Sequence, residues 1–209
     1  AARAPSSVAP MLPAGTLFAS DFRIERELSA GGMGTVYQVE QLSTGRKRAL
    51  KLMHPDLLRD PKLRERFELE AKVGARVDSE HVVEVIAAGI DPATSQPYLA
   101  MELLEGETLS AYLSRVGPLP PREVADLFRQ LCHAVGAAHA ASIIHRDLKP
   151  DNVFLSKSRR ADVRFTVKVL DFGIAKLLAE ATSARTAAMG SPMWMAPEQT
   201  EPGGHITPA

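Results

Sequence analysis

The residues best suited to chemistry lie in one polar string, IHRDLKPDN at residues 144–152. The carboxylate of Asp147 could accept a proton from a hydroxyl group. The ammonium group of Lys149 could neutralise phosphate charge, and the amide oxygen of Asn152 could ligate a hard cation. A polar turn stabilised by Asp and Asn side chains would explain a cluster of polar residues, but it does not explain this particular string.

A lysine and two acidic residues elsewhere also have candidate chemical roles. Lys51 lies in the apolar segment RALKLM, where burial of an ammonium group is costly without a charged partner. Glu70 follows on a helix face that is otherwise apolar, so the two could pair; a snorkelling lysine and a solvated glutamate are the alternative. Asp171 ends the strand-like segment VKVL and precedes Phe172-Gly173, which suits either a cation ligand on a movable segment or an ordinary strand exit.

A glycine cluster, LSAGGMGTV at residues 28–36, separates two segments that alternate like strands. Glycines at this place let a hairpin fold tightly and bring backbone N–H groups close to an anion. A dinucleotide-binding turn would require a helix after the glycines, but TVYQVE at residues 35–40 alternates like a strand, so that interpretation fails. A glycine-rich surface hairpin remains the alternative. A fifth motif, Ala-Pro-Glu at residues 196–198, carries no information by itself.

Composition limits the class of protein. The 209 residues contain 25 Lys+Arg and 25 Asp+Glu, and this zero formal charge argues against nucleic-acid or membrane binding through bulk charge. A hydrophobic fraction of 45% is ordinary for a globular domain with a core. The single cysteine excludes an intramolecular disulfide and a multi-cysteine zinc site, and we expect Cys132 to be a small core residue.

The elements that must position these residues divide the chain by character. Residues 1–20 are rich in Ala, Pro and Ser and read as a flexible leader. The next part is strand-rich, with one helix that opens at Asp60-Pro61. Beyond a hinge near residues 102–106, helical periodicity predicts a helix over residues 121–142. We expect its apolar face to comprise Val124, Leu127, Phe128, Leu131, Val135 and Ala138.

The five motifs together, in this order, resemble the signature set of protein kinases. The strings GGMGTVY, LLEGETL and HRDLKPDN most resemble bacterial serine/threonine kinases of the eukaryotic-like (Hanks) type. The resemblance implies an α+β, bilobal protein-kinase-like fold with an antiparallel five-stranded N-lobe and an incomplete helical C-lobe. The implied domains are the leader 1–20, an N-lobe over 21–105 and a partial C-lobe over 106–209.

The resemblance also implies a role for each matching residue. Asp147 would be the catalytic acceptor of the hydroxyl proton, Lys149 would lie by the γ-phosphate, and Lys51 would hold ATP phosphates, braced by Glu70. Magnesium, or manganese as an alternative, would be held by Asn152 and Asp171. The other expected nucleotide-binding residues are Leu28, Ser29, Gly31, Gly34, Val36, Ala49, Met101, Glu102, Leu104 and Phe154. Met101 would be the gatekeeper of the adenine pocket.

The activity implied by the resemblance is ATP-dependent phosphoryl transfer to Ser/Thr hydroxyls of protein substrates in signalling. Arg146, before Asp147, implies activation by autophosphorylation at Thr186, Thr182 or Ser183. One alternative is a pseudokinase that binds nucleotide without catalysis, although Lys51, Asp147 and Asp171 are all retained. A second alternative is a small-molecule phosphotransferase. We expect a cytoplasmic catalytic domain that binds no nucleic acid and whose parent could be anchored in a membrane beyond residue 209.

Departures from the family pattern modify these expectations. Ser29 stands at the first glycine position, which predicts a stiffer phosphate loop. Only a short Gly/Pro-rich tail follows Glu198, where relatives continue with helices. We therefore expect a kinase cut before its lower lobe is complete, unstable and weakly active on its own.

Overall fold

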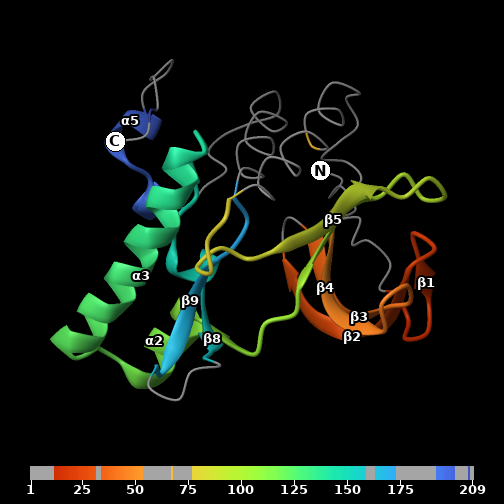
Figure 1. Cartoon of the computed structure of the whole chain (residues 1–209), viewed down its shortest axis with the longest axis horizontal. Coiled ribbons are helices and arrows are strands. Elements are labelled where there is room, and N and C mark those ends of the chain that lie inside the picture. The colour runs from red at the N-terminus through yellow and green to blue at the C-terminus, as the bar shows by residue number, and fades with distance from the viewer. Residues whose placement is uncertain are drawn as a thin grey trace, which may run out of the picture. The chain divides into compact units, whose positions relative to one another are not determined.

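The computed structural model describes residues 12–31, 34–53, 67, 77–158, 163–172, 192–200 and 207. The chain divides into two compact units. The first unit is Ala1–Asp56 with Ala87–Leu103, and the second unit is Leu57–Ile86 with Leu104–Ala209. Each unit carries one of the two sheets in the described part of the chain (Figure 1).

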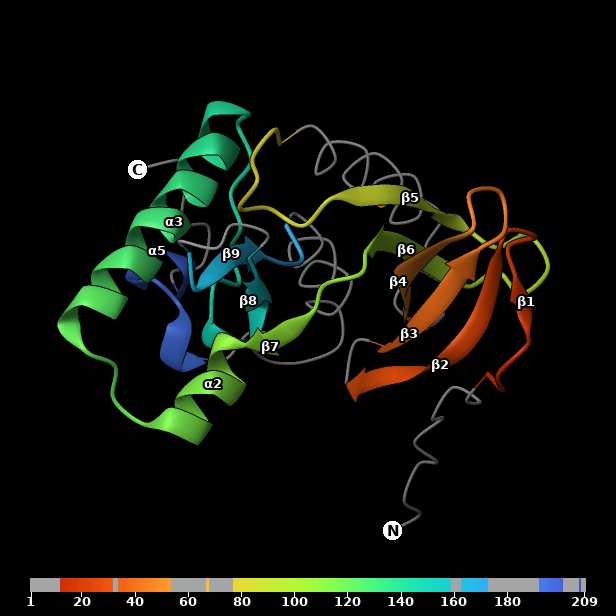
Figure 2. The same cartoon turned by 60° about the horizontal axis from the view of Figure 1, so that its bottom comes forward.

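A six-stranded sheet in the order β1-β2-β3-β4-β6-β5 dominates the first unit (Figure 2). Its strands are β1 (Leu17–Phe18), β2 (Phe22–Gly31), β3 (Gly34–Gln41), β4 (Arg46–Met53), β5 (Val85–Ile90) and β6 (Pro97–Glu102). The pairings from β1 to β4, and of β4 with β6, are antiparallel. The expected antiparallel N-lobe sheet is confirmed, with β1 as an additional strand.

Alternation along the strands separates the two faces of this sheet. Tyr37 pairs with Leu50, and both are almost fully buried in a cluster that also contains Val39 and Leu52. Because successive side chains of a strand point to opposite faces, Lys51 lies on the other face, beside its cross-strand neighbour Val36. The period-two pattern of RALKLM therefore decides which face carries the lysine.

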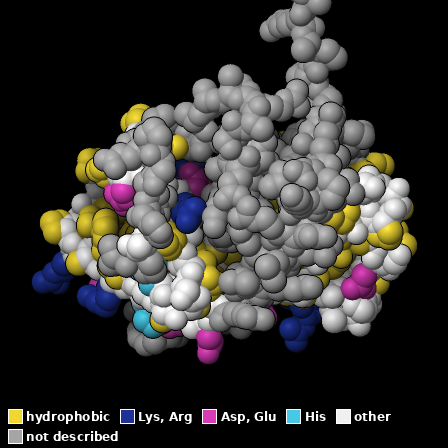
Figure 3. Space-filling view, turned by 90° about the horizontal axis from the view of Figure 1, so that it is seen from above, with side chains coloured by type: hydrophobic (Ala, Val, Ile, Leu, Met, Phe, Trp, Pro, Cys, Tyr) yellow, Lys and Arg dark blue, Asp and Glu magenta, His cyan; other side chains and the backbone are white. Residues whose placement is uncertain are grey.

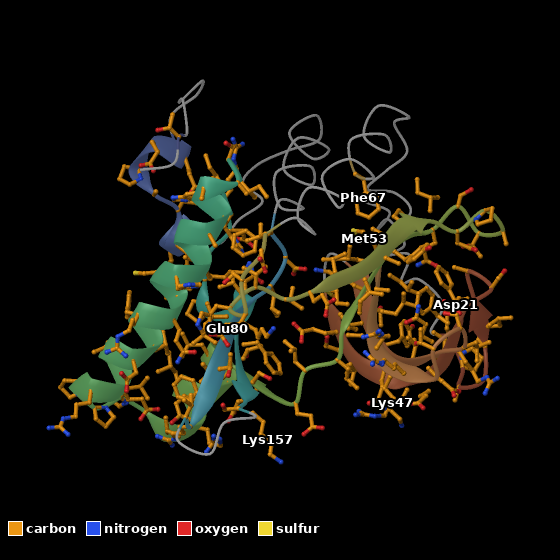
Figure 4. The ribbon with its side chains drawn as sticks, viewed as in Figure 1. Asp21, Lys47, Met53, Phe67, Glu80 and Lys157 are labelled. Atoms are coloured by element: carbon orange, nitrogen blue, oxygen red, sulfur yellow. The ribbon has the colours of Figure 1, made fainter. Side chains whose placement is uncertain are left out.

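The described part of the first unit includes residues before the expected boundary at residue 20. Phe18 on β1 is only 4% exposed, and its ring lies edge-on to Tyr98 at a centroid distance of 5.5 Å. Asp21, labelled in Figure 4, accepts hydrogen bonds from the backbone and hydroxyl of Ser43, which hold the turn after β3. These bonds also lower the pKa of the Asp21 carboxyl. Residues 12–20 lack strong periodicity, yet the Phe18 ring, the pairing of β1 with β2 and the backbone bonds between Gly15, Thr16 and Ile24 attach them to the sheet.

A three-stranded antiparallel sheet, β7-β8-β9, lies in the second unit. Its strands are β7 (Gly106–Thr108), β8 (Val153–Lys157) and β9 (Phe165–Val169), and its helices are α2 (Leu109–Val116), α3 (Pro121–Ala140) and the short α5 (Pro197–Thr200). Short 3-10 helices cover Pro150–Asn152 and Pro192–Trp194. The core between α3 and this sheet includes Leu127, Ala138, Val153 and Val167. The helix expected over 121–142 is thus confirmed to within two residues at its end.

The buried line of α3 differs from the apolar face expected from its periodicity. Leu127, Ala134 and Ala138 are buried, whereas Val124 is 37% and Phe128 56% exposed. The expectation that Cys132 is a core residue is wrong, because it too is exposed. Figure 3 shows hydrophobic side chains at the surface on the side where α3 lies. Periodicity marks every apolar position, but the described partner elements cover only part of that stripe.

The helix expected to open at Asp60-Pro61 lies outside the described residues, except for Phe67, which is helical and only 1% exposed. Within the ranges given above, none of the helices is both long and apolar enough to cross a membrane.

Candidate active site

His145 is held in one hydrogen-bonding state at the start of the polar string. Its Nε2 lies 2.8 Å from the carbonyl oxygen of Leu170, and its Nδ1 lies 3.2 Å from the backbone nitrogen of Asp147. A carbonyl can only accept and an amide N–H can only donate, so Nε2 carries the proton and Nδ1 accepts. The neutral ring thus ties the loop before Asp147 to the end of β9, and it also lies against the ring of Phe172 at 4.7 Å.

Burial is the main cause that lowers the pKa of His145 below its ordinary value of 6.5; the hydrogen bond to Leu170 acts in the opposite direction. The folded protein therefore binds fewer protons at this ring than the unfolded chain does, and the neutral ring stabilises the fold above pH 6.5. That contribution is lost as the pH falls below 6.5, because protonation would then place a charge on a buried ring. Protonation would also remove the acceptor for the Asp147 N–H.

We expect the free energy of unfolding to fall more steeply in wild type than in His145→Gln between about pH 7 and about pH 5.5. The glutamine amide can accept from Asp147 and donate to Leu170, but it does not titrate in this range. Urea unfolding across the series measures the slopes. Equal slopes in the two proteins would show that His145 does not carry the pH dependence.

The carboxylate of Asp147 is fixed by two side chains of the same loop. Among the described residues, Lys149 Nζ lies 3.0 Å and Asn152 Nδ2 2.9 Å from Asp147 Oδ2. Asn152 Nδ2 also donates to the backbone oxygen of Asp147 at 2.7 Å. The side chains of Lys149 and Asp147 are only 17% and 13% exposed, so this ion pair is weakly screened by solvent. Both contacts are to Oδ2, so neither of these two side chains contacts Oδ1.

The donor chemistry around Asn152 fits a hard cation. Both of its side-chain bonds use the amide nitrogen, which leaves the amide oxygen available to a cation. The backbone N–H of Leu170 donates to the carbonyl oxygen of Asn152 at 2.9 Å, which brings the end of β9 to this loop. Asp171 follows directly, in a left-handed backbone conformation with φ of 59°. Among the described residues no three His, Cys, Asp or Glu side chains form a metal cluster.

The first unit brings together most of the expected nucleotide-binding residues. Lys51, only 9% exposed, pairs across the sheet with Val36 on one side and Leu99 on the other. Ala49 likewise pairs with Met101. Leu28, Ser29, Gly31 and Gly34 lie on the β2–β3 hairpin, and Glu102 ends β6. One sheet therefore presents the hairpin, the lysine and the proposed gatekeeper together.

The second unit carries the remaining described candidates. Leu104 precedes β7, and Phe154 on β8 pairs with Thr108. Asp147 and Lys149 precede the 3-10 helix that ends at Asn152, and Asp171 follows β9. Glu70, Thr182, Ser183 and Thr186 lie outside the described residues.

One residue of this region was missed by the sequence reasoning. Gln199 on α5 donates from Nε2 to the backbone oxygen of Arg146 at 2.7 Å. Its only sequence signal is its position directly after Ala-Pro-Glu, and no spacing rule connects it to a residue 53 positions earlier.

Comparison with family models gives one description, "Protein kinase domain", matching residues 22–209. The chain is 44% identical over 182 residues to the serine/threonine-protein kinase Pkn1 of Myxococcus xanthus, which covers 86% of this chain and 25% of that protein. It is 34% identical over 189 residues to PknA of Mycobacterium tuberculosis, covering 88% and 42% of the two chains. The chain thus spans a quarter of Pkn1 and less than half of PknA.

Solved structures give the same fold. A crystal structure of the Mycobacterium tuberculosis PknI kinase domain aligns with a TM-score of 0.68 and 31% identity, covering 79% of this chain and 64% of that chain. A double-mutant form of the same kinase domain aligns with a TM-score of 0.77 and 28% identity over 95% of this chain and 72% of that chain.

Proposed function

Because the chain belongs to the protein kinase family, whose domain model covers residues 22–209, we propose that it transfers the γ-phosphoryl group of ATP to serine or threonine hydroxyls of proteins. The observation that carries this proposal is the arrangement of Asp147, Lys149 and Asn152. It provides a fixed carboxylate next to an ammonium group and an amide oxygen. This set suits a reaction that depends on positioning and charge neutralisation.

The proposed roles follow from the atoms. Oδ1 of Asp147 accepts the proton of the attacking hydroxyl as the oxygen–phosphorus bond forms. Lys149, besides fixing Asp147, neutralises charge on the transferred group. No covalent enzyme intermediate is needed, because the hydroxyl attacks in line with the departing diphosphate oxygen.

We propose a nucleotide-binding role for each matching residue by itself. Lys51 holds the α- and β-phosphates with Glu70 as its brace, and backbone groups at Glu102 and Leu104 bond the adenine edge. The apolar walls of the adenine site are Leu28, Val36, Ala49, Met101 and Phe154, with Ser29, Gly31 and Gly34 near the phosphates. Asn152 and Asp171 hold Mg2+, or Mn2+ in its place, which neutralises phosphate charge when bound.

Regulation by autophosphorylation is part of the proposal. A phosphate on Thr186, or on Thr182 or Ser183, would gain a charge-assisted bidentate pair with Arg146. The catalytic domain is proposed to act in the cytoplasm.

A thermal-shift titration with Mg-ATP tests nucleotide binding by the full-length protein. We expect saturating Mg-ATP to raise Tm by about 5 °C in wild type and by much less in Lys51→Ala. Lys47→Ala is the matched control, because Lys47 lies on the same strand but is 59% exposed and pairs with Glu25 (Figure 4). Its shift should equal that of wild type.

Phosphorylation of a generic Ser/Thr protein substrate then separates the enzyme from a pseudokinase. A Tm shift without phosphoryl transfer would favour the pseudokinase. Equal Tm shifts with Mg-ATP in wild type and Lys51→Ala would rule out a phosphate-binding role for this lysine.

A further inference from the structure

The peptide group that joins Arg146 to Asp147 is held from both of its edges. Its carbonyl oxygen, on Arg146, accepts a hydrogen bond from Gln199 Nε2 at 2.7 Å. Its N–H, on Asp147, donates to His145 Nδ1 at 3.2 Å. Because a peptide group is planar and its C=O and N–H point in opposite directions, these two bonds fix the tilt of the whole plane.

The amide of Gln199 is itself oriented. Its Oε1 accepts from the backbone N–H of Ala196 at 3.1 Å, and the N–H of Gln199 donates to the Ala196 carbonyl at 2.9 Å. With the oxygen bound to an N–H, the amide nitrogen must face the Arg146 carbonyl, as observed. The side chain is therefore a defined bridge between the segment 196–199 and the loop.

The bridged peptide lies at a strained position. Arg146 has a φ of 67°, in the left-handed region that residues with a Cβ rarely adopt. Such a conformation persists only where surrounding contacts determine it. Gln199 and His145 supply two such contacts at the peptide that leads into Asp147.

We propose that Gln199 is a positioning residue for phosphoryl transfer, which orients the Asp147 carboxylate by clamping the Arg146–Asp147 peptide. The inference rests on the proposed function of Asp147 as proton acceptor. It also gives the Ala-Pro-Glu segment a mechanical link to the catalytic loop. When residues 196–199 are in place, the peptide plane before Asp147 is fixed; when they move, one side of the clamp is lost.

Gln199→Glu in the full-length protein tests this link, because it keeps an acceptor for Ala196 and replaces the donor to Arg146 by a repelling oxygen. We expect kcat to fall about tenfold, with KM for Mg-ATP changed by less than about twofold. Hydrogen exchange of the Asp147 amide should also accelerate, because its plane is no longer held. Gln199→Met, which removes the bond without adding charge, should lower kcat less but in the same direction.

Gln130→Glu is the matched control in the second unit. Gln130 also bridges backbone groups, accepting from Val167 N–H at 2.8 Å and donating to the Phe165 carbonyl at 3.4 Å, away from the loop. The Gln130→Glu substitution should alter Tm without changing kcat or the hydrogen exchange rate of the Asp147 amide. Equal losses of kcat in the Gln199 and Gln130 variants, or unchanged Asp147 exchange in Gln199→Glu, would overturn the proposal. A wild-type protein that transfers no phosphate would refute the proposed function, while the exchange measurement would still decide whether the clamp exists.

Discussion

Asp147→Asn is expected to lower kcat by about 10²- to 10⁴-fold, the usual effect of removing a positioned general base. The substitution keeps the size and shape of the side chain but removes its ability to take the hydroxyl proton. The substitution also removes the ion pair with Lys149 and replaces the carboxylate that accepts a hydrogen bond from Asn152. We therefore expect a modest fall in Tm as well. Steady-state phosphorylation by the full-length protein measures kcat, and thermal unfolding shows that the variant is folded.

Asp126→Asn provides the control for the same chemical change at a surface site. Asp126 pairs with Arg129 on α3, and both side chains are more than half exposed, so the pair contributes little. Its kcat should match wild type. A loss of less than about tenfold in Asp147→Asn would mean that the carboxylate is not the main proton acceptor. Retention of Mg-ATP binding by Asp147→Asn would place the defect in the chemical step.

The grouping of the candidate residues around Asp147 could be predicted because they lie close together in the sequence. Asp147, Lys149 and Asn152 lie within six consecutive positions and contact one another directly. The sheet of the first unit was equally readable, since a period of two assigns Leu50 and Lys51 to opposite faces without knowledge of any partner.

Interactions between distant segments could not be predicted in this way. The bond from Gln199 to Arg146 spans 53 positions and depends on where α5 lies relative to the loop. The ring of Phe18 packs edge-on against Tyr98, and nothing near residue 18 in the sequence indicates that partner. Phe128 shows the reverse case, in which helical periodicity marks a core position but the described elements leave it exposed.

Gly34→Ala is expected to destabilise the protein by about 3 kcal/mol or more, through steric overlap and backbone strain together. Gly34 has a φ of 147°, and a Cβ added there would lie 2.0 Å from the carbonyl oxygen of Leu52. The obstacle is the backbone of β4, which cannot rotate away as a side chain could. Denaturant unfolding measures the loss, and Mg-ATP titration should show weakened binding because β4 also carries Lys51.

Gly31→Ala separates this structural requirement from a role at the phosphates. Gly31 pairs with Gly34 across the same hairpin, but a Cβ there meets no heavy atom of the described residues within 4 Å. We expect its stability to stay within about 0.5 kcal/mol of wild type. Any loss of Mg-ATP affinity in Gly31→Ala would then come from the approach of the hairpin to the nucleotide. Equal destabilisation by the two substitutions would contradict the assignment of the steric requirement to Gly34. The two substitutions thus separate a steric requirement of β4 at position 34 from the proposed role of the hairpin at the phosphates at position 31.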